Sequence, residues 1–557
     1  MTKRIIGIDL GTSNCVVAYA AVPAEDAKLD INLLPIPQVT DAGSVELGRT
    51  LPSFLYIPNA HELADGALAL PWNEQPEFAV GSFARNHGAK VPDRLVSSAK
   101  SWLCHTGIDR MSPVLPIGRD ASIPGISPVD ASARYLTHLR EAFDQALGAE
   151  TGADLDQQEV VLTVPASFDP SARDLTIEAA RRAGLTNVVL LEEPQAALYS
   201  WIDALGDGWR KELSVGDVVL VCDIGGGTTD FSLIAIKEIG GELALERIAV
   251  GEHILLGGDN MDFALAFALR KELEEAGTKL SNWQLTALVQ GARAAKELLL
   301  SNADVEVAPI VIPSRGSSFL KKNIKTELTR QKVIDIVAEG FFPQCAVSER
   351  PQPARRTGLT QLGLPYASDA AITRHLANFL TRNATDGTFV KPTALLFNGG
   401  VVQADPLRNR LVTVINSWLS TANSDPITVL DGVELDAAVA RGATYYGHAR
   451  AGRGIRIRGG TARSYYVGVE QSMPAVPGYE PPIMAVCVAP FGMEEGTHAE
   501  LEGHDFGLVT GEPARVRFFA SSVRKEDAVG DVLEDWDDET LTELPEIETT
   551  LNGMGDE

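Results

Sequence analysis

The chain has little positive charge, little cysteine and no long apolar run. Its 48 Lys and Arg residues face 75 Asp and Glu residues, which gives a formal net charge of −27 at pH 7. This excess of negative charge argues against nucleic acid as a primary partner and against binding to an anionic membrane surface. No apolar run approaches the ~20 residues that a membrane-spanning helix needs. We interpret the acidity itself as a contribution to solubility.

The five cysteines are scattered, and none belongs to a CxxC pair, so the spacing indicates neither a zinc site nor a disulfide framework. The N-terminus leads through Lys3-Arg4 directly into a predicted strand, without the pattern of a signal peptide. Together these features favour a reducing, cytoplasmic location. Two of the cysteines fall in predicted buried strands, where we expect them to be small core residues. These are Cys15 and Cys222, and the others are Cys104, Cys345 and Cys487.

A length of 557 residues with 45% apolar content allows a large core and more than one domain. In the first 450 residues, predicted strands alternate with predicted helices, which is typical of an α/β protein. Apolar patterns predict strands at 160–164, 188–191 and 394–397, and helices at 171–183, 282–300 and 435–446. Stretches rich in Pro, Gly or polar residues predict inserted or loop-like segments at 23–48, 106–128 and 343–367.

The pattern changes after residue 450. Gly452-Arg453-Gly454 predicts a linker over residues 451–463. Beyond it helical periodicity is absent, and short apolar runs at 464–469, 483–488 and 514–519 predict the strands of a small β-rich domain over 464–557. The acidic tail of this domain, 526–557, is expected to be solvated or disordered.

One local pattern occurs twice: a short apolar strand that ends in Asp and opens onto a turn rich in Gly and Thr. The first copy contains Asp9 and the second contains Asp223. Glycines let a phosphate approach the backbone N–H groups, which form an anion-binding nest together with Thr hydroxyls. A carboxylate beside such a nest would repel phosphate unless a cation lay between them, so the pair implies a hydrated Mg²⁺. A single copy fits an ordinary hairpin turn about as well, but two copies predict a duplicated architecture with a nucleotide between its halves.

Several segments, in matching order over residues 4–447, resemble the DnaK-type, seventy-kilodalton heat-shock chaperones. The resemblance implies an actin-like duplicated ATPase fold of two RNase H-like α/β lobes over residues 1–450, followed by a small β-rich, substrate-binding-like domain. The segments that carry it are Ile8–Cys15, Arg49–Ser53, Val164–Phe168, Glu193-Pro194, His253–Asp259, Asn398–Gly400 and Asp436–Ala440.

The resemblance also implies roles for individual residues around ATP or ADP and Mg²⁺. Asp9 and Asp223 would orient the waters of Mg²⁺, Glu193 and Asp230 would position the attacking water, and the hydroxyl of Thr228 would lie at the γ-phosphate. Two phosphate loops would be formed by Gly11, Thr12, Ser13 and Asn14 and by Gly225, Gly226 and Gly227. The adenosine would be surrounded by Gly257, Gly258, Lys296, Gly399, Gly400 and Asp436.

The sequence departs from the family pattern in three places. The resemblance implies a lysine as the cation at the transferring phosphate shortly after Val80-Gly81, where this chain has Arg85, and because the donor geometry of arginine differs we expect slow hydrolysis. The adenosine helix keeps Lys296 but carries Arg293 where an acidic residue is expected, which leaves the nucleotide preference open. The family's acidic-leucine linker and long helical lid have no counterpart, so we expect a divergent or truncated member.

The leading hypothesis is an ATP-hydrolysing chaperone or chaperone relative that binds unfolded or extended polypeptide through its C-terminal β-domain. As further partners, the resemblance implies a J-domain co-chaperone and a nucleotide-exchange factor. One alternative is a nucleotide-gated scaffold with little hydrolysis, which Arg85 and the altered adenosine helix favour. Less favoured alternatives are a small-molecule kinase of the same fold and a filament-forming actin relative.

Overall fold

The first sheet is built around an antiparallel β-hairpin, and two further strands lie on one side of this hairpin, parallel to its first strand. The sheet order is β11-β10-β1-β2-β3, with β6 paired to the other end of β2. β1 and β2 are antiparallel, and β10 and β11 run parallel to β1. The strands are β1 Arg4–Leu10, β2 Asn14–Ala21, β3 Asn32–Leu33, β6 Leu51–Pro52, β10 Glu159–Val164 and β11 Val188–Glu192.

The computed structural model describes residues 3–22, 29–59, 62–105, 107–148, 150, 152–239, 242–314, 323–353, 363–384, 387–458, 460–461, 463–470, 481–493, 497–501, 513–537 and 540–550.

The second sheet repeats this topology. Its order is β18-β17-β12-β13-β14-β19, with β12 and β13 antiparallel and β17 and β18 parallel to β12. The duplication predicted from the two Asp-ended strands is therefore confirmed. The strands are β12 Val218–Ile224, β13 Thr229–Ile239, β14 Glu242–Val250, β17 Ala394–Asn398, β18 Thr428–Val429 and β19 Ile457–Arg458.

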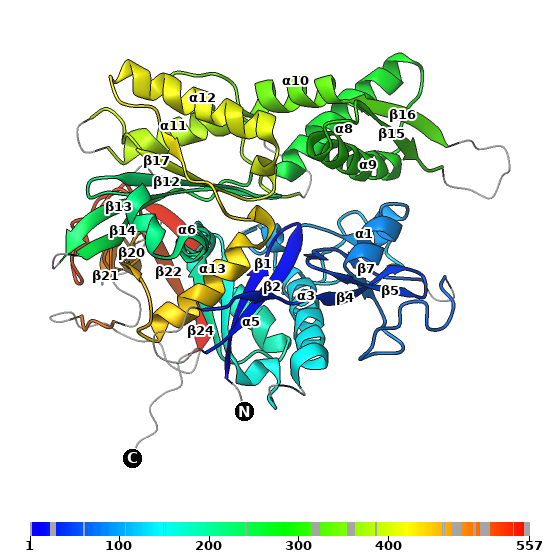
Figure 1. Ribbon diagram of the computed structural model, residues 1–557, viewed down its shortest axis with the longest axis horizontal. Helices are drawn as coiled ribbons and strands as arrows, with labels where there is room; N and C mark the ends of the chain where they lie inside the picture. Colours follow the sequence, from blue (N-terminus) through cyan, green and yellow to red (C-terminus); the bar gives the residue numbers. More distant parts are fainter. Residues whose placement is uncertain are drawn as a thin grey trace.

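Two helices lie between the sheets, and each packs on the half of the chain to which it does not belong (Figure 1). α6, Glu193–Leu205, follows β11 but packs on β12 and β17 of the second sheet. α13, Leu435–Arg450, follows β18 but packs on β1, β2 and β10 of the first sheet. The two helices approach closely because small residues line the contact: a Cβ on Gly442 would lie 1.7 Å from the carbonyl oxygen of Ala196. This exchange of helices joins the two halves into one body.

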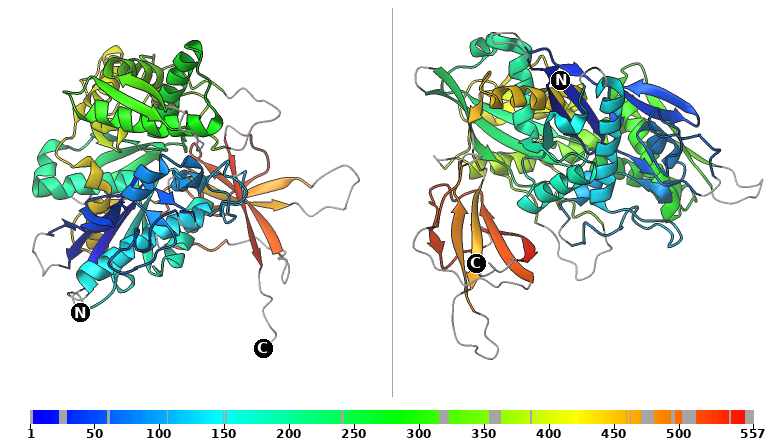
Figure 2. Two further views of the ribbon diagram at one scale, coloured as in Figure 1. Left: turned by 90° about the vertical axis from the view of Figure 1, so that its right-hand side faces the viewer. Right: turned by 90° about the horizontal axis from the view of Figure 1, so that it is seen from below.

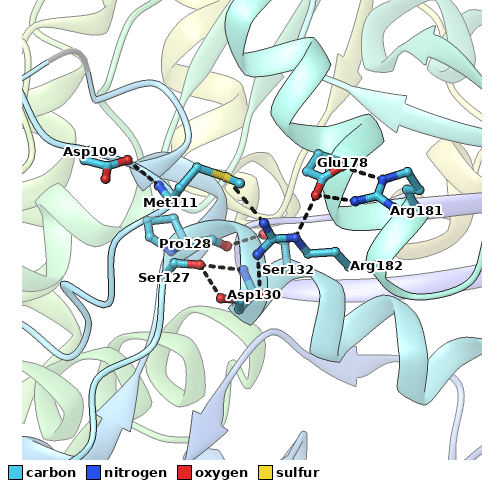
Figure 3. Close-up of polar contacts among 9 residues, drawn as sticks. All are labelled: Asp109, Met111, Ser127, Pro128, Asp130, Ser132, Glu178, Arg181 and Arg182. Atoms are coloured by element: carbon cyan, nitrogen blue, oxygen red, sulfur yellow. Dashed lines mark hydrogen bonds and ion pairs between the residues drawn. The ribbon is translucent and has the colours of Figure 1, made fainter.

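Further helices cover the outer faces of both sheets. On the first sheet, α3 and α5 pack side by side, and Arg182 of α5 joins them by a hydrogen bond to Asp130 of α3 at 2.5 Å, while Glu178 of α5 holds the same guanidinium at 2.8 Å (Figure 3). Ser127 caps α3 by accepting a hydrogen bond from the N–H of Asp130. On the second sheet, apolar side chains of β12 and β13 pack against α8, α9, α11 and α12. These helices are α3 Pro128–Phe143, α5 Pro170–Arg182, α8 Gly258–Glu275, α9 Asn282–Ser301, α10 Arg330–Phe341, α11 Ile372–Arg382 and α12 Asp405–Thr421.

Smaller elements extend each lobe, as Figure 1 shows on its right-hand side. The first lobe carries two small sheets, β4-β5 and β8-β7-β9, and the second carries the hairpin β15-β16. These elements are β4 Ile36–Asp41, β5 Ser44–Gly48, β7 Leu55–Tyr56, β8 Ala79–Val80, β9 Leu95–Val96, α1 Ser82–Gly88, α2 Ala99–Trp102, β15 Val307–Ile312 and β16 Ile324–Thr329. The short helix α7, Trp209–Glu212, instead packs against α6.

A five-stranded antiparallel sheet after residue 463 forms a separate layer beside the two lobes (Figure 2). Its order is β23-β21-β20-β22-β24, and its small core contains Tyr466, Cys487 and Phe519. The predicted β-rich domain is therefore present. Its strands are β20 Ser464–Glu470, β21 Ile483–Ala489, β22 Pro513–Ser521, β23 Val532–Leu533 and β24 Thr542–Thr550.

Two predictions about segments were wrong. The stretch 23–48, predicted as loop-like, contains β3, β4 and β5 in its described part. The tail 526–557, predicted as solvated or disordered, contributes β23 and β24, because pairing of β24 along β22 satisfies its backbone in spite of its acidic side chains. The predicted strands and helices listed for residues 160–446 are confirmed to within a few residues at their ends. Cys15 and Cys222 are buried core residues, and all five cysteines are free.

The close contact of α6 with α13 predicts a sharp difference between two helical glycines. Gly442→Ala would place a methyl group against the backbone of Ala196, and we expect a loss of roughly 1–3 kcal/mol from overpacking. Gly340→Ala in α10, where a Cβ meets nothing within 4 Å, is the matched control and should be neutral or stabilising by up to about 1 kcal/mol. Thermal unfolding of both variants measures the difference, and equal midpoints would contradict the close packing.

Candidate functional site

The turns after β1 and β12 face each other across the cleft between the lobes. A Cβ on Gly226 would lie 2.1 Å from the Oγ of Ser13, and a Cβ on Gly227 would lie 3.0 Å from Cγ2 of Thr12. Glycine at these positions therefore lets the second turn lie directly against the side chains of Ser13 and Thr12. The structure brings both predicted phosphate loops together, with their backbone on opposite sides of one narrow space.

The second turn rests on the first residues of α8. The N–H of Gly258 donates to the carbonyl of Gly225 at 3.0 Å, and the N–H of Asp259 donates to that of Gly226 at 2.7 Å. A Cβ on Gly257 would lie 2.6 Å from the Gly225 oxygen, so only glycine allows this approach. On the other side of the cleft, Ser53 supports the first turn by donating from its hydroxyl to the Gly11 carbonyl at 2.7 Å.

Four carboxylates and one lysine gather at the base of this space. Asp223, Asp230 and Glu193 are buried, and Asp9 ends β1 beside them. Lys100 is also buried, at 6% exposure, and its Nζ forms an ion pair with Glu193. Asp230 accepts a hydrogen bond from the N–H of Ser167 at 3.2 Å. The carboxylates come from β1, β12, β13 and the first turn of α6, and the lysine comes from α2, so both lobes contribute to the cluster.

The local excess of negative charge shifts the protonation of these groups. Burial, and then repulsion by Glu193, raises the pKa of Asp9 to about 7. Burial and the same neighbour raise the pKa of Asp223 well above its ordinary value. Burial alone would lower the pKa of Lys100, but Glu193 and Asp9 raise it above its ordinary value, so the lysine is charged. One lysine facing four carboxylates leaves uncompensated negative charge.

The cluster fits a divalent cation that is held through water. The raised pKa values of Asp9 and Asp223 show that a further positive charge would be favourable there. Within the part of the chain that the structure describes, no group of three or more His, Cys, Asp or Glu side chains converges as direct ligands of a metal ion. Mg²⁺ ordinarily keeps several of its waters and accepts one or two carboxylates, which matches this donor set. When bound with ATP, it would supply charge stabilisation at the phosphates.

The structure places Arg85, the predicted phosphate cation, outside this cluster. Arg85 lies in α1, which packs on the small sheets of the first lobe, and no described contact joins it to the four carboxylates. The basic side chain that the structure places among the carboxylates is Lys100. A signal was present in the sequence, because Lys100 stands in a stretch of small and apolar residues without a nearby acidic residue, Leu95-Val-Ser-Ser-Ala-Lys-Ser-Trp102. A lysine in such a stretch is rarely buried unless a distant carboxylate pairs with it.

The residues predicted around the adenosine are also brought together in part. A Cβ on Gly258 would lie 3.5 Å from each of Gly226 Cα, Lys296 Nζ and Val401 Cγ2. The Nζ of Lys296 donates to the Gly258 carbonyl at 3.1 Å. Asp436, which is exposed, accepts a 2.5 Å hydrogen bond from Gln403, three residues after the predicted Gly399-Gly400 turn ends. The residues predicted around the adenosine thus lie beside the second predicted phosphate loop.

Arg293 has acidic partners that the sequence did not reveal. Its Nε donates to Asp262 at 2.7 Å, and its other end forms an ion pair with Asp259. Lys296 forms an ion pair with the other oxygen of Asp262, also at 2.7 Å. The Arg293 guanidinium also lies 5.6 Å from the centroid of the Phe54 ring, which belongs to the opposite lobe. The basic residue at this position of the helix is therefore neutralised within the fold.

Direct contacts connect the two lobes across the cleft. Ser98, just before α2, donates to Asp259 of α8 at 2.5 Å. His105 lies 2.9 Å from the carbonyl oxygen of Gly363, and Leu364 packs into the core of the first lobe. The same segment is anchored to the second lobe, because the N–H of Ala367 donates to Leu255 at 3.1 Å. The predicted insertion 343–367 thus reaches from one lobe to the other.

The β-rich domain contacts the second lobe beside the carboxylate cluster. Arg247 of β14 forms a buried ion pair with Glu192 and donates to the Gly460 carbonyl. Glu192 adjoins Glu193 in sequence and is also bonded to Arg173 at 2.9 Å. Lys525 of the β-rich domain donates to the Ile248 carbonyl at 3.2 Å and to Asn383 at 3.1 Å. Glu192, the partner of Arg247, is therefore the direct sequence neighbour of Glu193, the partner of Lys100.

Comparison with known proteins places this site in a family. A family model described as Hsp70 protein matches residues 5–347. "Chaperone protein HscA" of Enterobacter sp. (strain 638) is 31% identical over 343 residues, which is 60% of this chain and 47% of that protein. "Chaperone protein HscA homolog" of Laribacter hongkongensis (strain HLHK9) is 31% identical over 316 residues, 56% of this chain and 44% of that protein. The chain therefore spans about half the length of the curated relatives it matches.

The duplicated sheets and the opposed phosphate loops define a protein of the actin-like ATPase fold, with a small β-rich domain after it. The family match covers more than half of the chain, and the chain belongs to the Hsp70 family. None of its described helices has both the length and the apolar character needed to cross a membrane.

The carboxylate cluster predicts an unusual pH dependence of stability. Because the pKa of Asp9 is about 7 in the folded chain and 3.8 ordinarily, ionisation of Asp9 costs stability progressively as pH rises between these values, and the cost is complete above the higher one. We expect Asp9→Asn, in EDTA without nucleotide, to raise the unfolding midpoint clearly at about pH 8 and less at about pH 5.5. Asp207→Asn, at a fully exposed side chain, is the control and should show no such trend. A gain that does not depend on pH would contradict the raised pKa.

Proposed function

We propose that the chain binds ATP with Mg²⁺ between its lobes, hydrolyses it slowly and acts as a DnaK-like chaperone on unfolded polypeptide. The observation that carries the proposal is the buried pair of Lys100 and Glu193 between the two opposed phosphate loops. Membership of the Hsp70 family supports the ATP-dependent part, and the names of the two HscA relatives support the chaperone part. A J-domain co-chaperone, a nucleotide-exchange factor and a cytoplasmic location remain predictions.

In this proposal the chain's own residues divide the work. The N–H groups of Thr12, Ser13, Gly226 and Gly227 bind phosphate oxygens from both sides. The charged Nζ of Lys100 stabilises the negative charge that shifts toward the leaving phosphate oxygens. Asp9 and Asp223 hold the waters of the cation. Glu193 and Asp230 orient the attacking water, and Glu193 keeps a raised pKa because of its burial, which suits a group that accepts a proton.

A nucleotide-gated scaffold with little hydrolysis is the second candidate. Its support from Arg85 is removed, because Lys100 supplies the cation that Arg85 was expected to supply. The altered adenosine helix still favours the scaffold, because Arg293 is paired there with Asp259 and Asp262. A small-molecule kinase of the same fold would require an added acceptor, so conversion of ATP without one would count against it.

Single-turnover hydrolysis of pre-bound ATP with Mg²⁺ tests the proposed chemistry. We expect Lys100→Met to slow conversion by roughly a hundredfold or more, because a buried cation at the phosphates is lost. Arg85→Met is the matched control and should change the rate by less than about threefold, since Arg85 lies outside the cluster. Equal losses in both variants would contradict the assignment of Lys100. Tight binding without conversion in the unaltered chain would favour the scaffold.

The contact of the β-rich domain with the second lobe predicts communication with the nucleotide site. We expect the affinity for a permanently unfolded, fluorescently labelled polypeptide to differ by at least about fivefold between the ATP and ADP states. Lys525→Ala, which removes two interdomain hydrogen bonds, should reduce this difference. Lys391→Ala, at an exposed position of the second lobe, is the control. Equal affinities in the two nucleotide states of the unaltered chain would exclude coupling.

A further inference from the structure

The last residue of β17 lies directly beside Asp223. The parallel register of β12 and β17 pairs Asp223 with Asn398. Asn398 is 3% exposed, and its Nδ2 donates to Oδ2 of Asp223 at 2.7 Å. Its Oδ1 is buried and has no hydrogen-bond partner within the described part of the chain. The amide nitrogen is therefore hydrogen-bonded to Asp223, whereas the amide oxygen is buried without a hydrogen-bond partner among the described residues.

The other half of the duplicated fold has the same arrangement. The parallel register of β1 and β10 pairs Ile8 with Leu162, which puts Thr163 at the level of Asp9. Thr163 is fully buried, and its hydroxyl lies 3.4 Å from both Oδ1 of Asp9 and the Ile8 carbonyl oxygen. In each half, the strand that runs parallel to the Asp-bearing strand thus presents a buried donor to that Asp. One donor is an amide and the other a hydroxyl.

Asn398 is a buried polar side chain at the end of an otherwise apolar strand, β17. The four preceding residues of the strand, Ala394–Phe397, are apolar and buried. A buried amide among them costs stability unless its hydrogen bonds are made, so the contact with Asp223 offsets that cost. A carboxylate next to Glu193 and Asp230 is repelled from several directions, and a fixed donor on one oxygen holds it in a single orientation.

The neighbouring glycine completes this arrangement. Gly399 has φ of 91°, a conformation that favours glycine. A Cβ there would lie 2.8 Å from Oδ1 of Asp223 and 2.4 Å from the Ile224 carbonyl oxygen. The turn after β17 therefore holds Oδ2 of Asp223 through Asn398 and leaves space around Oδ1. Asn398 and Gly399 act on the two oxygens of one carboxylate.

We propose that Asn398 is a positioning residue of the nucleotide site, which fixes Asp223 so that it can hold the waters of Mg²⁺, and that Thr163 does the same for Asp9. The proposal rests on the proposed function, because it assumes that Asp9 and Asp223 serve the cation. Asn398 acts through Asp223 and is not a catalytic residue.

A matched pair of substitutions separates positioning from packing. Asn398→Thr and Asn398→Val differ only in a hydroxyl against a methyl group, and threonine is the donor that the other half uses. The readout is the ratio of ADP affinities with Mg²⁺ and with EDTA, measured by calorimetry. We expect Asn398→Val to lose about tenfold or more of this ratio and Asn398→Thr to keep it within about threefold. ADP affinity in EDTA should be equal in both variants.

Three outcomes would overturn the proposal. Equal Mg²⁺ dependence in the Thr and Val variants would show that the donor is irrelevant, and a loss of ADP affinity in Asn398→Val that is as large in EDTA as with Mg²⁺ would show a merely structural role. If the position 398 variants fail to fold, Thr163→Ser and Thr163→Val provide the same comparison beside Asp9, and equal ratios there would overturn it as well. An unaltered chain whose ADP affinity ignores Mg²⁺ would contradict the proposed function itself, which is distinguishable from the first two results.

Discussion

The burial of several carboxylates around one lysine is the constraint on which the rest of this structure depends. Asp9, Asp223, Glu193 and Asp230 meet Lys100 in a space largely closed to solvent, where like charges repel strongly. Such a cluster is unfavourable in itself, and it persists only because the surrounding fold determines it. The raised pKa values of Asp9 and Asp223 reflect their burial and the repulsion by neighbouring carboxylates. In the proposed function, a nucleotide with its cation would relieve this repulsion, because the cation would compensate the carboxylates and backbone donors would bind the phosphates.

The duplicated architecture explains how the fold holds these groups in place. Each half places an Asp at the end of a central strand, a glycine-rich turn after it and a parallel strand beside it. Because α6 and α13 each pack on the opposite half, the two Asp residues are fixed relative to each other by the core of the protein. Glu193 belongs to the first turn of α6, so the same exchange of helices carries the third carboxylate into the cluster. Mechanical coupling between lobe position and site geometry follows directly from this connectivity.

Much of the fold could be predicted from the sequence, because its signals are local. Apolar strands ending in Asp9 and Asp223, with glycines directly after them, are visible within a few residues. The strands within 23–48 were missed because the Pro and Gly content of this segment is typical of loops, although β4 and β5 pair around a tight turn at Gly43, where φ is 74°. In β24, acidic composition predicted solvation, but backbone pairing with β22 determined the structure.

The parts of the site that escaped prediction depend on contacts between distant residues. Lys100 and Glu193 lie 93 positions apart, and the local sequence around Lys100 does not reveal which carboxylate it meets. Asn398 and Asp223 lie 175 positions apart and meet only through the register of a parallel strand pair. Arg293 looked unpartnered because Asp259 and Asp262 belong to the preceding helix. Spacing along the chain predicts which elements form, but tertiary packing decides which charges meet.

Thermal unfolding of the unaltered chain under four conditions tests the central claim most directly: without additions, with Mg²⁺ alone, with ADP in EDTA, and with ADP and Mg²⁺ together. The account predicts a large rise of the unfolding midpoint only with ADP and Mg²⁺ together, since only then are both the carboxylates and the phosphate loops satisfied. An equal rise with ADP in EDTA, or no rise under any condition, would contradict the assignment of the cluster to a nucleotide-bound cation.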